Sequence, residues 1–258
     1  MNAWYMSGAG NDFMVIDARG LDLDFSKLSK ELCKKMNCDG FMAVDNSDIA
    51  HFKLHFYNAD GSRGEMCGNG SRCVAKFAHD NGIAPADMTI ETDAGLLTAL
   101  RIDENRYQVM LNNPGIVDLH RHGGMAYVEL GCPGVPHGVY RYEGLDWSMR
   151  DELRERMRAE RYADYFPKGA NINYYDVLSE DRVRILTFER GVEDFTLACG
   201  TGSGSVAAVL WLTGQLPGGV VAVENPGGTL EFALTGENGA VTSIKMTGPA
   251  ELVQVCEI

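Results

Sequence analysis

The chain has 258 residues, of which 45% are hydrophobic and 23% charged, a balance typical of a folded globular protein. Its net charge of −13 argues against nucleic acid or an anionic membrane as a partner, and no apolar run approaches the roughly 18 residues of a membrane span. No signal peptide is visible, and the seven cysteines follow no zinc-ligand spacing. The sequence therefore predicts a cytoplasmic protein with reduced thiols and no metal site.

The first half of the chain is predicted to be mostly β-structure around one helix. A glycine turn at 8–10 precedes the first strand, and residues 26–36, with Ser26 as the cap, have the apolar spacing of a short amphipathic helix. The predicted strands cover residues 11–17, 41–44, 52–57, 88–92, 95–101 and 106–111. A loop at 112–115 is expected to close this half.

The second half repeats this pattern. After a strand at 125–130, residues 131–137 are predicted to form a loop and residues 151–162 a strongly charged helix with a solvated face. The remaining predicted strands cover residues 171–174, 183–188, 220–224, 229–233 and 241–246.

One motif occurs in both halves, as Met66-Cys67-Gly68-Asn69-Gly70-Ser71 and as Ala198-Cys199-Gly200-Thr201-Gly202-Ser203. A constant offset of 132 positions relates the two copies, and each is followed by an apolar helix expected to end at a glycine, Gly82 or Gly214. This register indicates an internal duplication. We therefore predict two domains, residues 1–116 and 117–247.

Each copy of the motif places a cysteine at the start of a helix. The first N–H groups of a helix have no internal partners, so they can bind an anion, and the helix dipole favours a thiolate there. Two such units facing each other would clamp a small acid between two thiols. The structural alternative is a pair of buried cysteines beside tight turns.

The ordered motifs of this chain resemble those of the diaminopimelate epimerase family, which are cofactor-independent amino-acid epimerases. The motifs that carry the resemblance are Gly8-Ala9-Gly10-Asn11-Asp12-Phe13, Tyr57-Asn58-Ala59-Asp60-Gly61-Ser62, Met66-Cys67-Gly68-Asn69-Gly70-Ser71-Arg72-Cys73, Glu189-Arg190-Gly191, Ala198-Cys199-Gly200-Thr201-Gly202, Pro226-Gly227-Gly228 and Met246-Thr247-Gly248-Pro249. They span essentially the full length. The resemblance implies an α/β (α+β) fold of two pseudo-symmetric domains, each a β-barrel-like sheet around a central helix, with the active site between them. It also implies that residues 248–258 cross back onto the first domain, and it favours a homodimer.

The activity that the resemblance implies is epimerisation of LL-2,6-diaminopimelate to the meso form, a step toward lysine and peptidoglycan precursors, without a cofactor. Cys67 and Cys199 match the family's acid/base pair, which exchanges protons with the α-carbon. The residues that match the substrate site are Asn11, Asn58, Gly68, Asn69, Asn171, Glu189, Arg190, Gly200 and Thr201.

Two other functions stay open at this stage. The family commonly has Gly-Asn-Pro-His where this chain has Gly134-Val135-Pro136-His137, so the missing amide leaves room for a racemase of another amino acid, for instance histidine. A thiol redox or anion-binding protein would be a different class, although Cys-x-x-Cys is absent. We interpret Cys33, Cys132 and Cys256 as core or incidental cysteines, and Cys73 as a packing residue inside the first helix.

Overall fold

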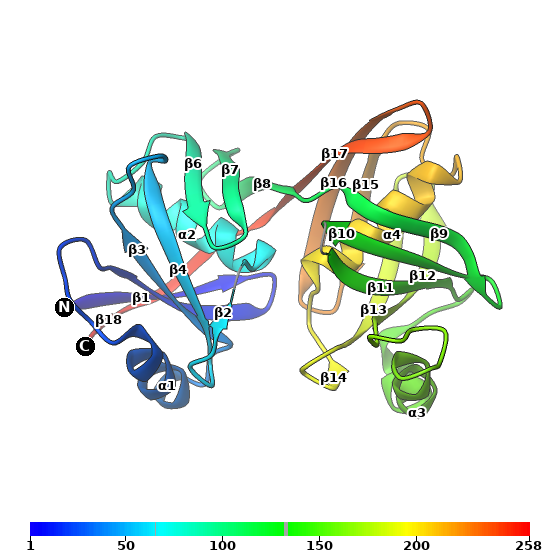
Figure 1. Ribbon diagram of the computed structural model, residues 1–258, viewed down its shortest axis with the longest axis horizontal. Helices are drawn as coiled ribbons and strands as arrows, with labels where there is room; N and C mark the ends of the chain where they lie inside the picture. Colours follow the sequence, from blue (N-terminus) through cyan, green and yellow to red (C-terminus); the bar gives the residue numbers. More distant parts are fainter. Residues whose placement is uncertain (65, 132–133) are drawn as a thin grey trace. The chain divides into compact units, whose positions relative to one another are not determined.

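The computed structural model describes residues 1–64, 66–131 and 134–258, so the prediction for Cys132 lies outside the described residues. The chain divides into two compact units. Unit 1 comprises Met1–Met110 and Thr247–Ile258, and unit 2 comprises Leu111–Met246. In each unit one helix lies among the strands, α2 (Gly68–Asp80) in unit 1 and α4 (Gly200–Leu212) in unit 2 (Figure 1).

Unit 1 is built on one mixed sheet. Besides α2, its elements are β1 (Asn2–Gly8), β2 (Asn11–Asp17), α1 (Phe25–Met36), β3 (Gly40–Asp45), β4 (Phe52–Asn58), β5 (Arg63–Gly64), β6 (Asp87–Thr92), β7 (Gly95–Arg101), β8 (Arg106–Leu111) and β18 (Glu251–Glu257). The strands pair in the order β18-β1-β2-β3-β4-β6-β7-β8. Only β2–β3 and β4–β6 among these pairs are parallel.

Unit 2 repeats this topology. Besides α4, its elements are β9 (Pro114–His122), β10 (Met125–Gly131), β11 (Gly134–Arg141), the 3-10 turn η1 (Trp147–Met149), α3 (Arg150–Arg161), β12 (Asn171–Ser179), β13 (Arg182–Glu189), β14 (Asp194–Phe195), β15 (Val220–Asn225) and β16 (Gly228–Glu237), and β17 (Ala240–Pro249) leads back into unit 1. The order β9-β10-β11-β12-β13-β15-β16 has parallel pairs at β11–β12 and β13–β15. The predicted α/β class, with a repeated sheet around a central helix, is confirmed.

The two central helices have equivalent bounds. Each has 13 residues, and the offset of 132 positions relates their first and last residues. Gly82 and Gly214 follow each helix two positions after its last residue with positive φ angles of 67° and 71°, a backbone conformation that favours glycine. Most of both helices is buried, because the surrounding strands cover every side of them.

The outer helices differ in detail from the predictions. Helix α1 begins at Phe25 and is capped by Asp24, whose side chain accepts from Lys27 N at 3.0 Å, so the predicted Ser26 cap is wrong. Ser26 instead donates to the Gly61 carbonyl at 2.8 Å. Helix α3 has the predicted solvated face, and its buried residues are Leu153, Met157 and Arg161.

Within the described ranges, three of the longer strands escaped prediction, as did the two-residue strands β5 and β14. Strand β1 was not predicted, β9 begins inside the predicted 112–115 loop, and β11 covers much of the predicted 131–137 loop. Pro136 lies in β11 although proline cannot donate to a ladder. Pairing of β11 with β12 begins only at His137, so Pro136 needs to join only the antiparallel pair with β10.

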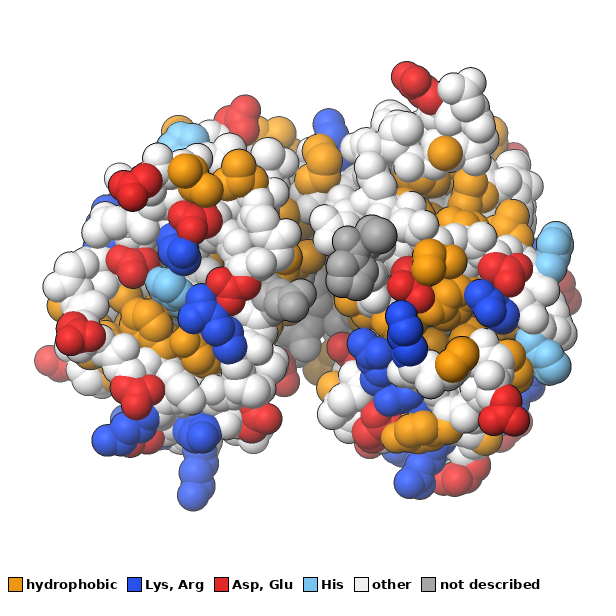
Figure 2. Space-filling view, in the orientation of Figure 1, with side chains coloured by type: hydrophobic (Ala, Val, Ile, Leu, Met, Phe, Trp, Pro, Cys, Tyr) orange, Lys and Arg blue, Asp and Glu red, His pale blue; other side chains and the backbone are white. Residues whose placement is uncertain are grey.

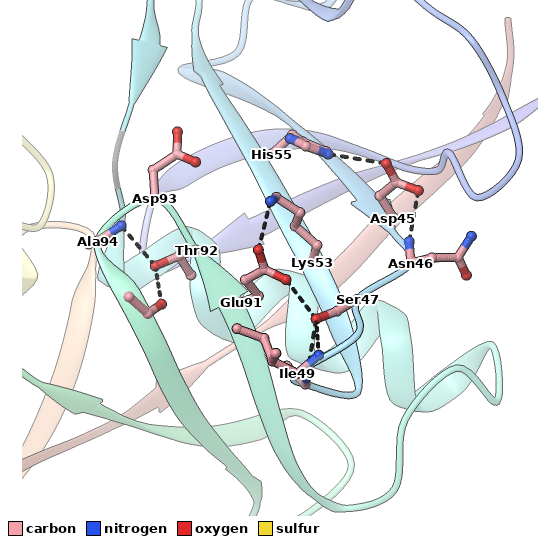
Figure 3. Close-up of polar contacts among 12 residues, drawn as sticks. Asp45, Asn46, Ser47, Ile49, Lys53, His55, Glu91, Thr92, Asp93 and Ala94 are labelled. Atoms are coloured by element: carbon pink, nitrogen blue, oxygen red, sulfur yellow. Dashed lines mark hydrogen bonds and ion pairs between the residues drawn. The ribbon is translucent and has the colours of Figure 1, made fainter.

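The outer face of β4 is polar, as its alternating pattern predicts. Lys53 Nζ lies 2.7 Å from Glu91 Oε1, and His55 Nε2 lies 3.2 Å from Asp45 Oδ2 (Figure 3). On the face shown in Figure 2, acidic and basic side chains are interspersed over both units. Among the described residues, every helix is too short or too polar to cross a membrane.

Candidate functional site

The two motif cysteines occupy the same position in their helices. Cys67 is the N-cap of α2 with φ −133° and ψ 117°, and its carbonyl accepts from Ser71 N at 2.7 Å. Cys199 is the N-cap of α4 with φ −113° and ψ 107°, and its carbonyl accepts from Ser203 N at 2.9 Å. The predicted placement of each cysteine at the start of a helix is therefore confirmed.

The sulfur of Cys199 faces hydrogen-bond donors of its own helix. Gly202 N donates to Cys199 Sγ at 3.4 Å, and Thr201 Oγ1 lies 3.6 Å from the same sulfur. The residue is buried, whereas Cys67 is partly exposed. A backbone N–H aimed at the sulfur stabilises negative charge there, so the first turn of α4 suits a thiolate.

The second glycine of each motif allows close packing of the first helical turn. A Cβ added at Gly202 would lie 2.3 Å from Asn173 Oδ1 on β12, and one at Gly70 would lie 1.7 Å from Met42 Cε on β3. Any side chain at these positions would therefore force its neighbour to move. The glycines thus let each helix begin directly against a strand.

In unit 1, the predicted residues Asn11 and Asn69 are in direct contact. The hairpin turn at Ala9 and Gly10, with positive φ angles at both, places Asn11 at the start of β2. Asn69 Nδ2 donates to Asn11 Oδ1, and Asn11 Nδ2 donates to Asp39 Oδ2 at 3.3 Å. The side chain of Asn58 lies at the end of β4 and donates to Ser62 Oγ at 3.0 Å instead.

In unit 2, the predicted residues Asn171, Glu189 and Arg190 lie together. Asn171 begins β12, and its Oδ1 accepts from Arg190 N at 2.7 Å. Glu189 ends β13, and its Oε2 accepts from Thr196 Oγ1 at 2.9 Å. The Arg190 guanidinium donates to the Lys168 carbonyl at 3.4 Å and is exposed. A buried amide and an exposed cation thus lie at the same end of the paired strands β12 and β13.

His137 joins this group although it was not predicted as a site residue. It is completely buried on β11, with Nδ1 3.1 Å from Asn173 Nδ2 and Nε2 3.5 Å from Asn171 Nδ2. Burial first, and the positive charge of Arg190 second, lower the pKa of His137 to about 3. The ring is therefore neutral at physiological pH.

Amide donors face both ring nitrogens of His137. Asn173 Nδ2 donates to the Gly138 carbonyl at 3.0 Å, which fixes this amide with its N–H groups toward the ring. Asn171 Oδ1 accepts from Arg190 N, which turns Asn171 Nδ2 toward Nε2 of the ring. The two amides therefore oppose a second proton on His137. Asn173 likewise went unpredicted, although it stands two positions after Asn171, on the same face of a strand.

The remaining predicted residues lie at the starts of the two central helices. Gly68, Gly200 and Thr201 form the first turns of α2 and α4, where N–H groups lack partners within the helix. Val135, which replaces the amide common in the family, lies on β11 with 37% of its surface exposed. In the described part of the chain, no three His, Cys, Asp or Glu side chains are grouped so that they could hold a metal ion.

Solved structures with the same fold include two proteins of low sequence identity. A phenazine biosynthesis protein of the PhzF family from Bacillus anthracis matches with a TM-score of 0.75 at 16% identity, covering 100% of this chain and 98% of that chain. A probable proline racemase from Agrobacterium radiobacter K84 matches with a TM-score of 0.65, also at 16% identity, covering 100% and 92%. The chain thus has the duplicated fold that these proteins share.

Sequence comparison assigns the chain to one family with this fold. A family model described as diaminopimelate epimerase matches residues 3–117 and 133–253. A diaminopimelate epimerase of Chlorobaculum tepidum is 34% identical over 262 residues, covering 96% of this chain and 97% of the relative. One from Aquifex aeolicus is 38% identical over 233 residues, covering 83% and 82%. The chain belongs to the diaminopimelate epimerase family.

Proposed function

We propose that this chain converts LL-2,6-diaminopimelate to the meso isomer, with Cys67 and Cys199 as the catalytic acid/base pair. Membership of the family supports the reaction. The observation that carries the assignment of the cysteines is their equivalence, since each is the N-cap of a 13-residue buried helix in its own unit. A pair of merely structural cysteines would not need to repeat this position.

The proposed reaction inverts one α-carbon by two proton transfers. One cysteine, as thiolate, removes the α-proton, and the other, as thiol, delivers a proton to the opposite face, so the two sulfurs exchange protonation states in each turnover. This mechanism requires the two thiols to reach opposite faces of the same carbon. The N–H groups at Gly68-Asn69 and Gly200-Thr201 suit the α-carboxylate and the negative charge that spreads onto it.

The surrounding polar residues suit the rest of the substrate. Arg190 can pair with a carboxylate and Glu189 with an ammonium group, while Asn11, Asn58 and Asn171 supply amide donors and acceptors. We propose these five residues as substrate contacts. A cytoplasmic location and a homodimer stay predictions of the sequence.

A racemase acting on another amino acid is the second candidate, and Val135 is the observation that favours it. Its aliphatic side chain cannot donate to the second carboxylate of diaminopimelate. The two-thiol chemistry would be the same, and only the recognition of the substrate side chain would differ.

The decisive measurement is proton NMR in D2O under reducing conditions. Loss of the α-proton and inversion would be followed for LL-diaminopimelate and for a panel that includes L-histidine. We expect inversion of diaminopimelate in the wild type, none in Cys67→Ala or Cys199→Ala, and full activity in Cys256→Ala, a partly buried cysteine on β18.

The outcomes separate the candidates. Inversion of another amino acid with diaminopimelate inert would replace the substrate and keep the mechanism. Inversion that survives in either motif variant would rule out the two-thiol mechanism.

A further inference from the structure

We infer that Asp39 and Arg72 are positioning residues that together fix the orientation of Asn11 and Asn69 beside Cys67. Four side chains of unit 1 form an unbroken chain of hydrogen bonds, from the guanidinium of Arg72 through the two amides to the carboxylate of Asp39. The structural part of this inference stands alone, whereas its consequence for catalysis rests on the proposed function.

The chain joins three elements of unit 1. Arg72 Nη2, on α2, donates to Asn69 Oδ1 at 3.0 Å, and Asn69 Nδ2 donates to Asn11 Oδ1 at the start of β2. Asn11 Nδ2 donates to Asp39 Oδ2, which also accepts from Asp12 N at 2.9 Å. Asp39 immediately precedes β3. The first turn of α2 is thereby tied to the beginnings of two strands.

The ends of the chain determine its direction. An arginine can only donate and a carboxylate can only accept, so each amide between them has one allowed orientation. If Asn11 were flipped, its oxygen would face the Asp39 carboxylate and its nitrogen would face the Asn69 nitrogen. Two like groups would then oppose each other at both ends of that amide. Arg72 and Asp39 therefore decide which side of each amide remains for a ligand.

Arg72 is held rigidly where it makes these contacts. Its side chain is completely buried, Nε donates to the Pro249 carbonyl at 3.2 Å, and Nη1 donates to the Gly68 carbonyl at 3.5 Å. The Gly68 contact matters because Gly68 is the residue after Cys67. The guanidinium thus braces the turn that carries the cysteine as well as the amide of Asn69.

Arg72 also supplies a fixed positive charge near Cys67. Burial lowers the pKa of Arg72 to about 10, and the negative charges that Cys73 and Cys67 can carry oppose this shift. The guanidinium therefore stays protonated at neutral pH. Attraction between the guanidinium and the Cys67 thiolate is mutual, so Arg72 favours the ionised form of this cysteine.

The first test follows the reactivity of Cys67 and needs no epimerase activity. The rate of Cys67 alkylation by iodoacetamide would be measured against pH by peptide mass spectrometry. In Arg72→Gln we expect the midpoint of this profile to rise by about one pH unit, and in Arg72→Lys to stay near that of the wild type. Arg72→Lys keeps the charge and loses the fork of donors.

Lys76→Gln is the matched control, because Lys76 is a second buried cation on α2, one turn further from Cys67. Its Nζ donates to the Glu104 carbonyl at 2.8 Å and pairs with Asp80, so it takes no part in the chain. We expect Lys76→Gln to lower the folding stability and to leave the pH midpoint of Cys67 alkylation unchanged. Equal midpoints in Arg72→Gln and the wild type would overturn the electrostatic part of the inference.

The second test addresses the exposed end of the chain, where substitution endangers folding least. We expect Asp39→Ala to lower kcat/KM about tenfold, and Asp39→Asn to retain most of the activity because its Oδ1 can still accept from Asn11. Wild-type kcat/KM in Asp39→Ala would overturn the positioning role of Asp39. If the substrate assignment itself fails, the wild type and all variants are inactive on diaminopimelate alike, and the alkylation profile still decides the electrostatic part of the inference.

Discussion

His137 Nδ1 lies 3.1 Å from Asn173 Nδ2, so a buried imidazole faces a hydrogen-bond donor across two neighbouring parallel strands. Protonation of Nδ1 would set two N–H groups against each other at a fully buried ring. Burial first, and the positive charge of Arg190 second, lower the pKa of His137 to about 3 from an ordinary value of 6.5.

This depressed pKa predicts a loss of stability in acid. Between pH 6.5 and about 3 the unfolded chain binds one more proton at His137 than the folded chain, so the free energy of unfolding should fall as the pH falls. Within this pH window the free energy of unfolding should fall by about 1.4 kcal/mol for each pH unit. Above pH 6.5 the ring is neutral in both states, so the full stability is present there. The free energy of unfolding, measured with urea at several pH values, should depend less steeply on pH in His137→Gln than in the wild type. The exposed His120→Gln serves as the control, and an equal slope in both variants would contradict this account.

The two close-packed glycines should differ in their response to substitution. In Gly202→Ala the new methyl group meets Asn173 Oδ1, which accepts from Thr187 Oγ1 at 3.0 Å and is held in place. In Gly70→Ala it meets the mobile end of Met42. We expect Gly202→Ala to lower the free energy of unfolding by about 1–3 kcal/mol and Gly70→Ala by less. Gly218→Ala, with open space around it, should leave the free energy of unfolding unchanged. Chemical denaturation of the three variants would measure this quantity. Equal losses in Gly70→Ala and Gly202→Ala would contradict the prediction.

Val135 offers a direct test of substrate choice. Val135→Asn introduces an amide at a partly exposed position of β11, so the fold should tolerate it. If the proposed substrate is correct, the variant should raise kcat/KM for diaminopimelate, by as much as about tenfold for one added hydrogen bond. Val135→Thr should have a smaller effect. An unchanged kcat/KM for diaminopimelate and for every other amino acid tested would show that position 135 does not contact substrate.

Strand β18 should be essential to unit 1. It pairs antiparallel with β1 from Asn2 to Ser7, and β2 pairs with β1 on the other side, so removal of β18 leaves β1 as an exposed edge. A chain ending at Ala250 should lose hydrogen-exchange protection in β1 first. Protection in β12 and β13 of unit 2 is the internal control. Unchanged protection of β1 would mean that β2 alone holds it.

The sequence predicts local and repeated features well. The offset between Cys67 and Cys199 predicted two equivalent helices, because a duplicated chain segment keeps its local hydrogen bonds and capping. The alternation of β4 predicted which residues face the core. These features depend on neighbours in the chain, and such neighbours are visible in the sequence.

The missed features depend on contacts between distant segments. His137 became a site residue only when β11 paired with β12, and Asp39 met Asn11 only through the parallel pairing of β2 and β3. Strand β1 starts the chain with few pattern cues, and its partner β18 lies at the other end. The hydrophobic periodicity of one segment cannot predict a strand partner more than two hundred residues away in the sequence.

The pairing of β1 with β18 has a consequence for biosynthesis. Unit 2 is one continuous stretch, Leu111–Met246, whereas unit 1 combines Met1–Met110 with Thr247–Ile258. During synthesis from the N-terminus, all residues of unit 2 are therefore made before β18, the partner of β1. Unit 1 begins to be synthesised first, but its sheet is complete only after residues 251–257 have been added.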